Sequence, residues 1–109
     1  MARSSKVTRS SGNIFVDLGS RNPEEELFKA DLVLSLRRDV EREKLTQKEA
    51  ADRMGLKQPD VSKLLSGKIA GFSLERIMAC VRALNTDVEV RLKKNRSKIP
   101  GKIRVLEVT

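Results

Sequence analysis

Residues 46–68, TQKEAADRMGLKQPDVSKLLSGK, constrain the fold of this chain more than any other stretch. Two short segments with apolar residues at helical spacing flank Gly55, so the pattern predicts one helix over residues 47–54 and another over residues 58–65. Gly55 stands where the first helix must end, and a left-handed residue closing a helix costs least as glycine. The sequence therefore predicts two helices joined by a tight turn.

Small and branched apolar residues in this stretch allow the two helices to cross closely. Ala51 is expected to face Val61 and Leu64 across the turn. Thr46 begins the T-x-x-E pattern of a capping box, which favours a helix start at the next residue. Together these residues predict a helix-turn-helix, in which the first helix supports a second helix with an exposed face.

The same residues resemble the Xre (Cro/CI-like) helix-turn-helix family, whose pattern reads LTQ.EAA...G..Q..VS.LL.G. The resemblance implies that polar residues on and beside the second helix contact DNA. Two positions depart from the family pattern: Lys57 replaces a small hydroxyl cap, and Asp60 brings negative charge near the phosphates. The expected DNA-binding residues are Gln47, Lys57, Gln58, Asp60, Ser62, Lys63 and Lys68.

The chemistry of these side chains suits duplex DNA. Gln58 can pair with both hydrogen-bonding atoms of an adenine edge, and Lys63 can reach a guanine edge or a phosphate. Gln47, at a helix amino end, suits a phosphate contact that positions the protein without reading sequence. Asp60 has two interpretations: an acid that stabilises the helix dipole, or an acceptor for a cytosine amino group.

Bulk composition narrows the function classes. The chain has 109 residues, with 23 basic and 15 acidic side chains and a formal charge of +8, which favours polyanionic partners. No apolar run is long enough to span a bilayer and no signal peptide is evident, so we expect a cytoplasmic, nucleoid-associated protein rather than a membrane protein. Histidine is absent and Cys80 is the only cysteine, so we expect no enzyme, no metal site and no cofactor. Cys80 itself is predicted to be a buried apolar residue.

The amino-terminal region divides into two parts. Residues 1–12 are polar and basic and are expected to form a flexible arm, which can either remain solvated or track DNA. A compact apolar cluster follows, too short for a stable helix and in need of a partner surface. Its residues are Ile14, Phe15, Val16 and Leu18.

The stretch GNIFVDLGSRNPEEE around this cluster resembles the small, antitoxin-like branch of the Xre family, of the HigA type. The resemblance runs from about Gly12 to Lys93. It implies a partner toxin of the RelE/HigB ribonuclease kind, with the apolar cluster as its candidate contact site. A stand-alone Xre-type regulator without a toxin is the alternative.

Two further helices are predicted around the helix-turn-helix. Asn22 as a cap, Pro23 at the first helical position and three following acidic residues start a helix that is expected to run to about Lys44. After residues 70 and 71, Ser73 is the expected cap of a helix that Asn85 closes. The expected core residues of the first helix are Leu27, Phe28, Ala30, Val33, Leu34, Leu36 and Val40, and those of the last are Leu74, Ile77, Met78, Val81 and Leu84.

The periodicity changes near the carboxyl end. Val88, Val90 and Leu92 alternate with charged residues, which predicts a half-buried strand over residues 87–93. Residues 94–101 form a basic loop with a Pro-Gly turn, and residues 102–108 partly alternate as a second strand. Two pairings remain open: a hairpin within the chain, or pairing of residues 87–93 with a second copy across a twofold axis.

The predicted fold is mainly α, a four- to five-helix Xre-type helix-turn-helix domain with a C-terminal β-strand or hairpin that can complete a dimer sheet. The domain is expected over residues 13–93, between the arm 1–12 and the basic tail 94–109. The expected function is a homodimeric, sequence-specific repressor of a palindromic double-stranded DNA operator that is also an antitoxin. RNA binding is disfavoured because only 3% of residues are aromatic, which leaves few surfaces for base stacking.

Overall fold

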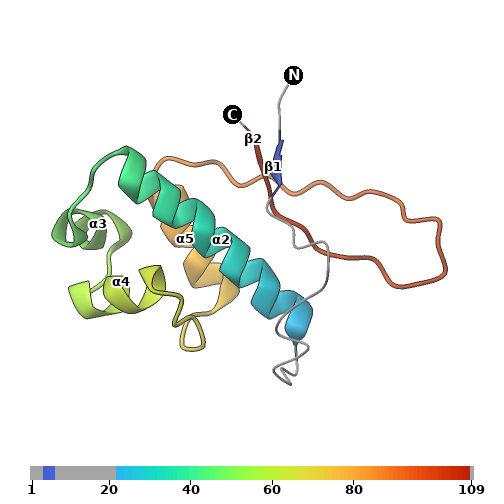
Figure 1. The fold of residues 1–109 in the computed structure, drawn as a ribbon, viewed down its shortest axis with the longest axis horizontal. Helices are drawn as coiled ribbons and strands as arrows, with labels where there is room; N and C mark the ends of the chain where they lie inside the picture. The colour runs from blue at the N-terminus through green and yellow to red at the C-terminus, as the bar shows by residue number, and fades with distance from the viewer. Residues whose placement is uncertain (1–3, 7–21, 109) are drawn as a thin grey trace.

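The computed structural model describes residues 4–6 and 22–108 of the chain (Figure 1). Within this part the fold is mainly helical, as the sequence predicts. The helices pack into one body, and two short strands lie at its side. The elements are β1 (Ser4–Lys6), α2 (Pro23–Arg42), α3 (Gln47–Met54), α4 (Gln58–Leu65), α5 (Leu74–Ala83) and β2 (Leu106–Val108).

Local signals account for the bounds of α2. Pro23 occupies the first turn and acidic residues follow it, as predicted. Asn22 is the N-cap residue, as predicted, and its carbonyl oxygen accepts the first helical bond from the Glu26 N–H at 3.0 Å. Its side chain makes no capping bond, contrary to what its residue type favours. The helix ends at Arg42, two residues earlier than expected, because Lys44 adopts a left-handed φ of 54°.

The start and end of α5 follow the predicted signals. The Ser73 hydroxyl accepts a hydrogen bond from the Arg76 N–H at 3.1 Å, which confirms the predicted cap. Asn85 has a left-handed φ of 65° just beyond the helix, which confirms it as the closing residue.

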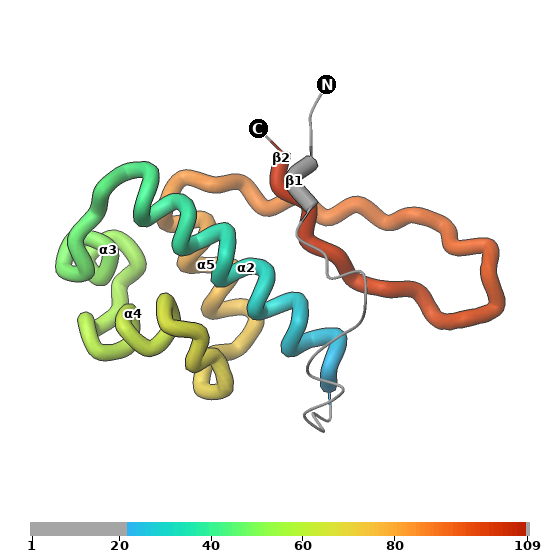
Figure 2. The backbone as a smooth tube through the Cα atoms, viewed as in Figure 1, coloured from blue at the N-terminus to red at the C-terminus, as the bar shows by residue number. Residues whose placement is uncertain are grey.

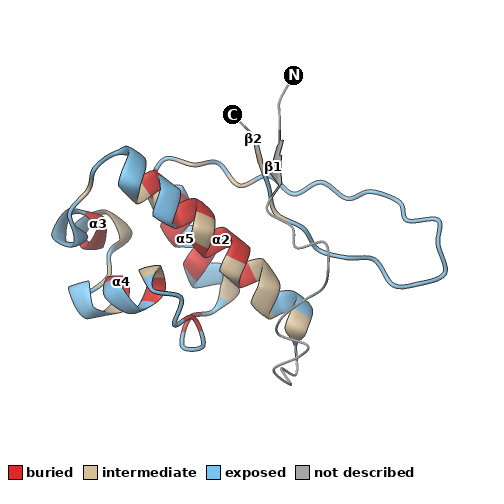
Figure 3. Cartoon of the chain, in the orientation of Figure 1, coloured by how far each residue is buried: buried red, intermediate tan, exposed pale blue. Residues whose placement is uncertain are grey.

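The core forms where α2, α4 and α5 meet (Figure 3). Leu36, Leu64 and Ile77 come from these three helices and are fully buried. A smaller apolar cluster, of Ala50, Ala51 and Val61, joins α3 to α4. The predicted set of core residues on α2 is only partly correct. Leu32 is buried although it was not in the set, whereas Leu27 and Leu34 were in the set and are half-buried.

Polar residues of α2 are buried as well, which the sequence analysis did not anticipate. Burial reaches Lys29, Asp31, Ser35 and Asp39, since α2 is covered on more than one side. Lys29 forms ion pairs with two acids of the first turn. The Asp39 carboxylate accepts a hydrogen bond from the Thr86 hydroxyl at 2.8 Å and pairs with Arg42, so it joins α2 to the chain that leaves α5.

The C-terminal segment differs most from the prediction. Figure 2 shows residues 86–105 leaving α5, running out beyond the helices and returning to β2. The prediction of a strand over residues 87–93 was wrong for the single chain, and of the two pairings left open the intrachain hairpin does not form, because β2 pairs instead with β1. The pairing is antiparallel and places Ser5 opposite Glu107. β1 lies in the predicted flexible arm, whose other residues are outside the described part of the chain.

Candidate nucleic-acid interface

One face of α4 is buried and the other is open to solvent. Val61 and Leu64 are fully buried beneath the helix. On the opposite face, Gln58 and Ser62 are exposed and lie one turn apart, and exposed Lys63 adjoins them. A short helix therefore presents an amide, a hydroxyl and an ammonium group together, at one end of the molecule (Figure 1).

The polar side chains around this face are not engaged by other residues in the described part of the chain. No side-chain hydrogen bond or ion pair joins them to any residue that the structure describes. They can accept a ligand without first breaking an internal contact. The residues that share these properties and are also exposed are Gln47, Lys57, Gln58, Ser62, Lys63 and Lys68.

Asp60 differs from these residues because it is half-buried, in the first turn of α4. That position suits an acid that stabilises the amino end of a helix. Lys57, directly before the helix, provides no side-chain cap, in agreement with its departure from the usual small hydroxyl residue. The first turn of α4 therefore lacks a side-chain cap but contains a favourable negative charge.

The turn before α4 fixes its position relative to α3. Gly55 has a left-handed φ of 70°, and the N–H groups of Gly55 and Leu56 both donate to the Ala51 carbonyl. A Cβ atom built on Gly55 would meet no atom within 4 Å, so conformation rather than space requires glycine here. Leu56 then packs against both apolar clusters.

The capping box at the start of α3 is complete. The Thr46 hydroxyl accepts from the Glu49 N–H at 3.0 Å, and the Glu49 carboxylate accepts from the Thr46 N–H at 2.8 Å. Gln47 follows as the first residue of the helix and is exposed. Gln47 therefore stands in the first turn, where N–H groups lack a helical partner, an arrangement suited to a phosphate oxygen.

One further cation near this face was not predicted as a site residue from the sequence. Arg76, in the first turn of α5, is exposed and lies 4.9 Å from the centre of the Phe72 ring. It lines a shallow hollow together with Lys63 and Lys68, and Asp60 lies on the same hollow. The Ser73 cap, three residues earlier, is the local signal that places Arg76 in this first turn.

The remaining candidates divide into buried and undescribed residues. Cys80 is buried, and this burial raises the pKa of its thiol above the ordinary value, although the positive charge of Arg76 opposes the shift. A neutral, buried thiol is a poor nucleophile. The apolar cluster of residues 14, 15, 16 and 18 lies outside the described residues.

Other classes of site find no support in the described residues. Residues 4–6 and 22–108 contain no group of three or more metal-ligating side chains close enough to hold an ion. None of the helices α2 to α5 combines the length and the apolar character that crossing a membrane would require.

Comparison with known proteins places this geometry in a family. Residues 14–93 match the model of a family described as "Helix-turn-helix domain". A solved structure named "Putative XRE Family Transcriptional Regulator" is 40% identical to the chain, with a TM-score of 0.73, and the match covers 77% of this chain and 96% of the other. No curated protein matches the chain.

Proposed function

We propose that this chain, which belongs to the XRE family of helix-turn-helix, DNA-binding transcription regulators, acts as a homodimeric repressor that reads a palindromic operator. The observation that carries the proposal is the open face of α4. Gln58, Ser62 and Lys63 are exposed there and have no partner within the described chain, while Val61 and Leu64 anchor the helix from below.

The proposed reading mode uses the major groove. An α-helix fits this groove, where each base pair presents a distinct pattern of donors and acceptors. Gln58 would pair with adenine, and Lys63 would contact a guanine edge or a phosphate. Gln47, Lys57 and Lys68 would fix the protein on the backbone through contacts that carry no sequence information.

A second copy is required for useful specificity. A correct base contact contributes about 1 to 3 kcal/mol of discrimination, and one short helix offers only two or three such contacts. A twofold dimer doubles this number and places its two α4 helices about 34 Å apart, one turn of DNA. Such a dimer at its own promoter would act as an autorepressor.

The test compares operator affinity between variants. We expect the Gln58→Ala/Lys63→Ala double variant to bind the cognate palindrome at least tenfold more weakly, since it loses base contacts of about 1 to 3 kcal/mol each. Fluorescence anisotropy at a fixed salt concentration measures the two affinities.

The matched control removes the same chemical groups from another surface. Asn95→Ala/Lys94→Ala also deletes one amide and one lysine, both exposed on the C-terminal loop. This variant should bind the operator with an affinity within about threefold of the wild type. Equal operator affinity for wild type and the Gln58→Ala/Lys63→Ala variant would remove α4 from the proposed site.

A second role, as the antitoxin of a toxin-antitoxin pair, is favoured by the resemblance of GNIFVDLGSRNPEEE to HigA-type proteins. The partner would be a RelE/HigB-type ribonuclease that contacts Ile14, Phe15, Val16 and Leu18. Apolar side chains this dense, beside a polar basic arm, suit an apolar groove on a partner. The stand-alone regulator is the competing role.

Co-expression with the product of a neighbouring reading frame tests the antitoxin role. We expect the two proteins to co-purify, and Phe15→Asp to abolish the complex while operator binding persists. If no neighbouring product binds the chain, the stand-alone regulator is the correct role. If a product binds equally well after residues 1–20 are deleted, the apolar cluster is excluded as its site.

A further inference from the structure

The first part of the C-terminal segment has an extended backbone that no other described residue pairs with. Across residues 87–94, no backbone group hydrogen-bonds to any other described residue. Val90 is 81% exposed and Leu92 is 92% exposed, although both are large apolar side chains. An extended stretch with free N–H and C=O groups is a template for pairing with another strand.

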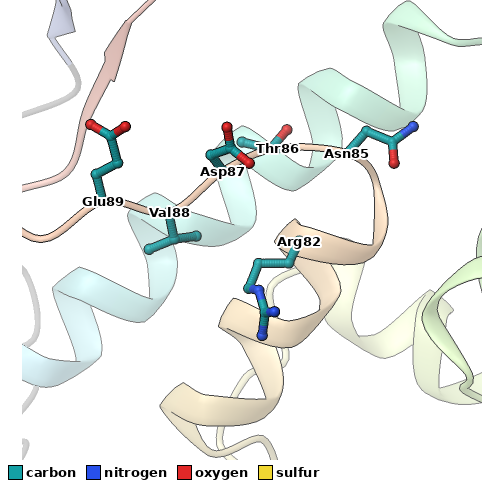
Figure 4. Close-up of a pocket in the computed structure, with 6 residues that line it drawn as sticks. All are labelled: Arg82, Asn85, Thr86, Asp87, Val88 and Glu89. Carbon is teal, nitrogen blue, oxygen red and sulfur yellow. The ribbon is translucent and has the colours of Figure 1, made fainter.

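The side chains of this stretch alternate between two sides. Figure 4 shows Asp87 and Glu89 pointing to one side of the chain and Val88 to the other, towards α5. Val88 packs against the main core cluster. In a strand, Val90 and Leu92 would share the side of Val88, whereas Arg91 and Lys93 would share the side of the two acids.

The order of charges makes this stretch complementary to itself. The sequence from Asp87 to Lys93 reads DVEVRLK, with acids in its first half and bases in its second. Antiparallel pairing of two copies about Val90 would place Glu89 opposite Arg91 of the partner subunit. It would also place Asp87 opposite the partner's Lys93 and Val88 opposite the partner's Leu92, each pair occurring twice.

Other registers of the two paired strands do not give these charge and apolar pairs. A shift by one residue would place apolar side chains opposite charged ones, on the wrong faces. A pairing centred on Glu89 would place that acid opposite its own copy, and one centred on Arg91 would do the same with a base. Like charges directly opposite each other are destabilising.

We propose that residues 87–93 form an antiparallel, twofold β-pairing with a second copy of this chain, centred on Val90. The occupant of the open edge is then the same stretch of the partner subunit. The partner's Leu92 would extend the apolar surface that Val88 begins over the helical core. This inference supplies the interface of the homodimer proposed above, and pairing itself does not require DNA.

Charge reversal tests the interface in the full-length chain. Glu89→Arg would place arginine opposite arginine twice, and Arg91→Glu would place glutamate opposite glutamate twice. We expect each single variant to raise the dimer dissociation constant about tenfold or more, and the Glu89→Arg/Arg91→Glu double variant to restore it to within about threefold of wild type. Sedimentation velocity over a concentration series measures these constants.

Each result of the charge-reversal experiment either supports or overturns the pairing. Rescue by the double variant supports the pairing, because two substitutions that act independently would each weaken the dimer and would not cancel. A monomeric wild type, unchanged single variants or a double variant as weak as the singles would overturn it. All variants should keep the helical circular dichroism of the wild type, since residues 89 and 91 are exposed outside the helices.

Cross-linking tests the register. In a Cys80→Ser background, mild oxidation should join two copies of the Val90→Cys variant by a disulfide readily and two copies of the Arg91→Cys variant poorly, because residues directly opposite lie within disulfide reach and diagonal ones do not. Preferential linkage through residue 91 would overturn the proposed centre.

Failure of the DNA-binding proposal would be seen separately, as absence of operator binding by a chain that still shows the charge-reversal rescue.

Discussion

The helical body, residues 22–85, and the C-terminal segment, residues 86–108, differ in their charge balance and in how far they bury their apolar side chains. The body carries 12 basic and 11 acidic residues and buries its large apolar residues, whereas the segment carries seven basic and three acidic residues and exposes Val90, Leu92 and Ile99. The body is therefore specified by its own contacts. The segment exposes large apolar side chains that none of the described residues covers.

The distribution of charge adds to this contrast. The body has almost no net charge, so its candidate DNA-binding face depends on where particular cations lie rather than on overall attraction. The segment supplies much of the positive excess, which favours approach to polyanions without selecting a sequence. In the proposed function, sequence reading therefore belongs to α4 and general attraction to DNA to the C-terminal segment.

The largest effect on stability should come from the body. Leu64→Ala removes a fully buried side chain between α4 and the core and should lower the free energy of unfolding by about 2 to 5 kcal/mol. Ile99→Ala, on the exposed loop, should change it by less than about 0.5 kcal/mol. Urea denaturation of both variants measures the contrast. Equal losses would show that the loop is packed in solution.

A smaller effect is expected at the junction of the two regions. Thr86→Val keeps the shape of the side chain but deletes the hydrogen bond to the buried Asp39 carboxylate. The free energy of unfolding should fall by about 1 to 2 kcal/mol, because that carboxylate loses a donor and is partly shielded from water. Thermal and urea denaturation provide the measurement. An unchanged stability would mean that the segment is not anchored to α2 through Thr86.

The smallest of these effects concerns a local signal within the body. Thr46→Ala removes the acceptor of the capping box and should cost about 1 kcal/mol, whereas Thr46→Ser should cost much less since the hydroxyl remains. The comparison of the two variants by urea denaturation isolates the cap from the side-chain volume. A serine variant as unstable as the alanine variant would contradict the capping role.

The accuracy of the sequence-based predictions follows the same division between the two regions. The bounds of α3 and α4 were predicted correctly because Thr46, Gly55 and the apolar spacing act within a few residues of each end. The buried polar residues of α2 were not predicted, since Asp39 is covered by chain that lies 47 residues away and provides Thr86.

The strands show why the rest could not be read from the sequence. β1 is the polar tripeptide Ser-Ser-Lys, with no alternation to mark it, and it pairs with residues about one hundred positions later. Residues 87–93 do alternate, but alternation does not identify the partner strand. The DNA-contacting role of the α4 side chains stays a prediction, since exposure shows that they are available and not what they bind.

Selection of operator sequences from random duplex DNA tests the central claim most directly. The bound fragments are sequenced after selection with the wild type and, separately, with Gln58→Ala. Wild-type protein should enrich a palindrome, and the variant should lose base preference at one symmetric pair of positions, because a contact to a base edge has been removed. An identical palindrome from both proteins, with equal preference at every position, would contradict the assignment of α4 as the reading helix.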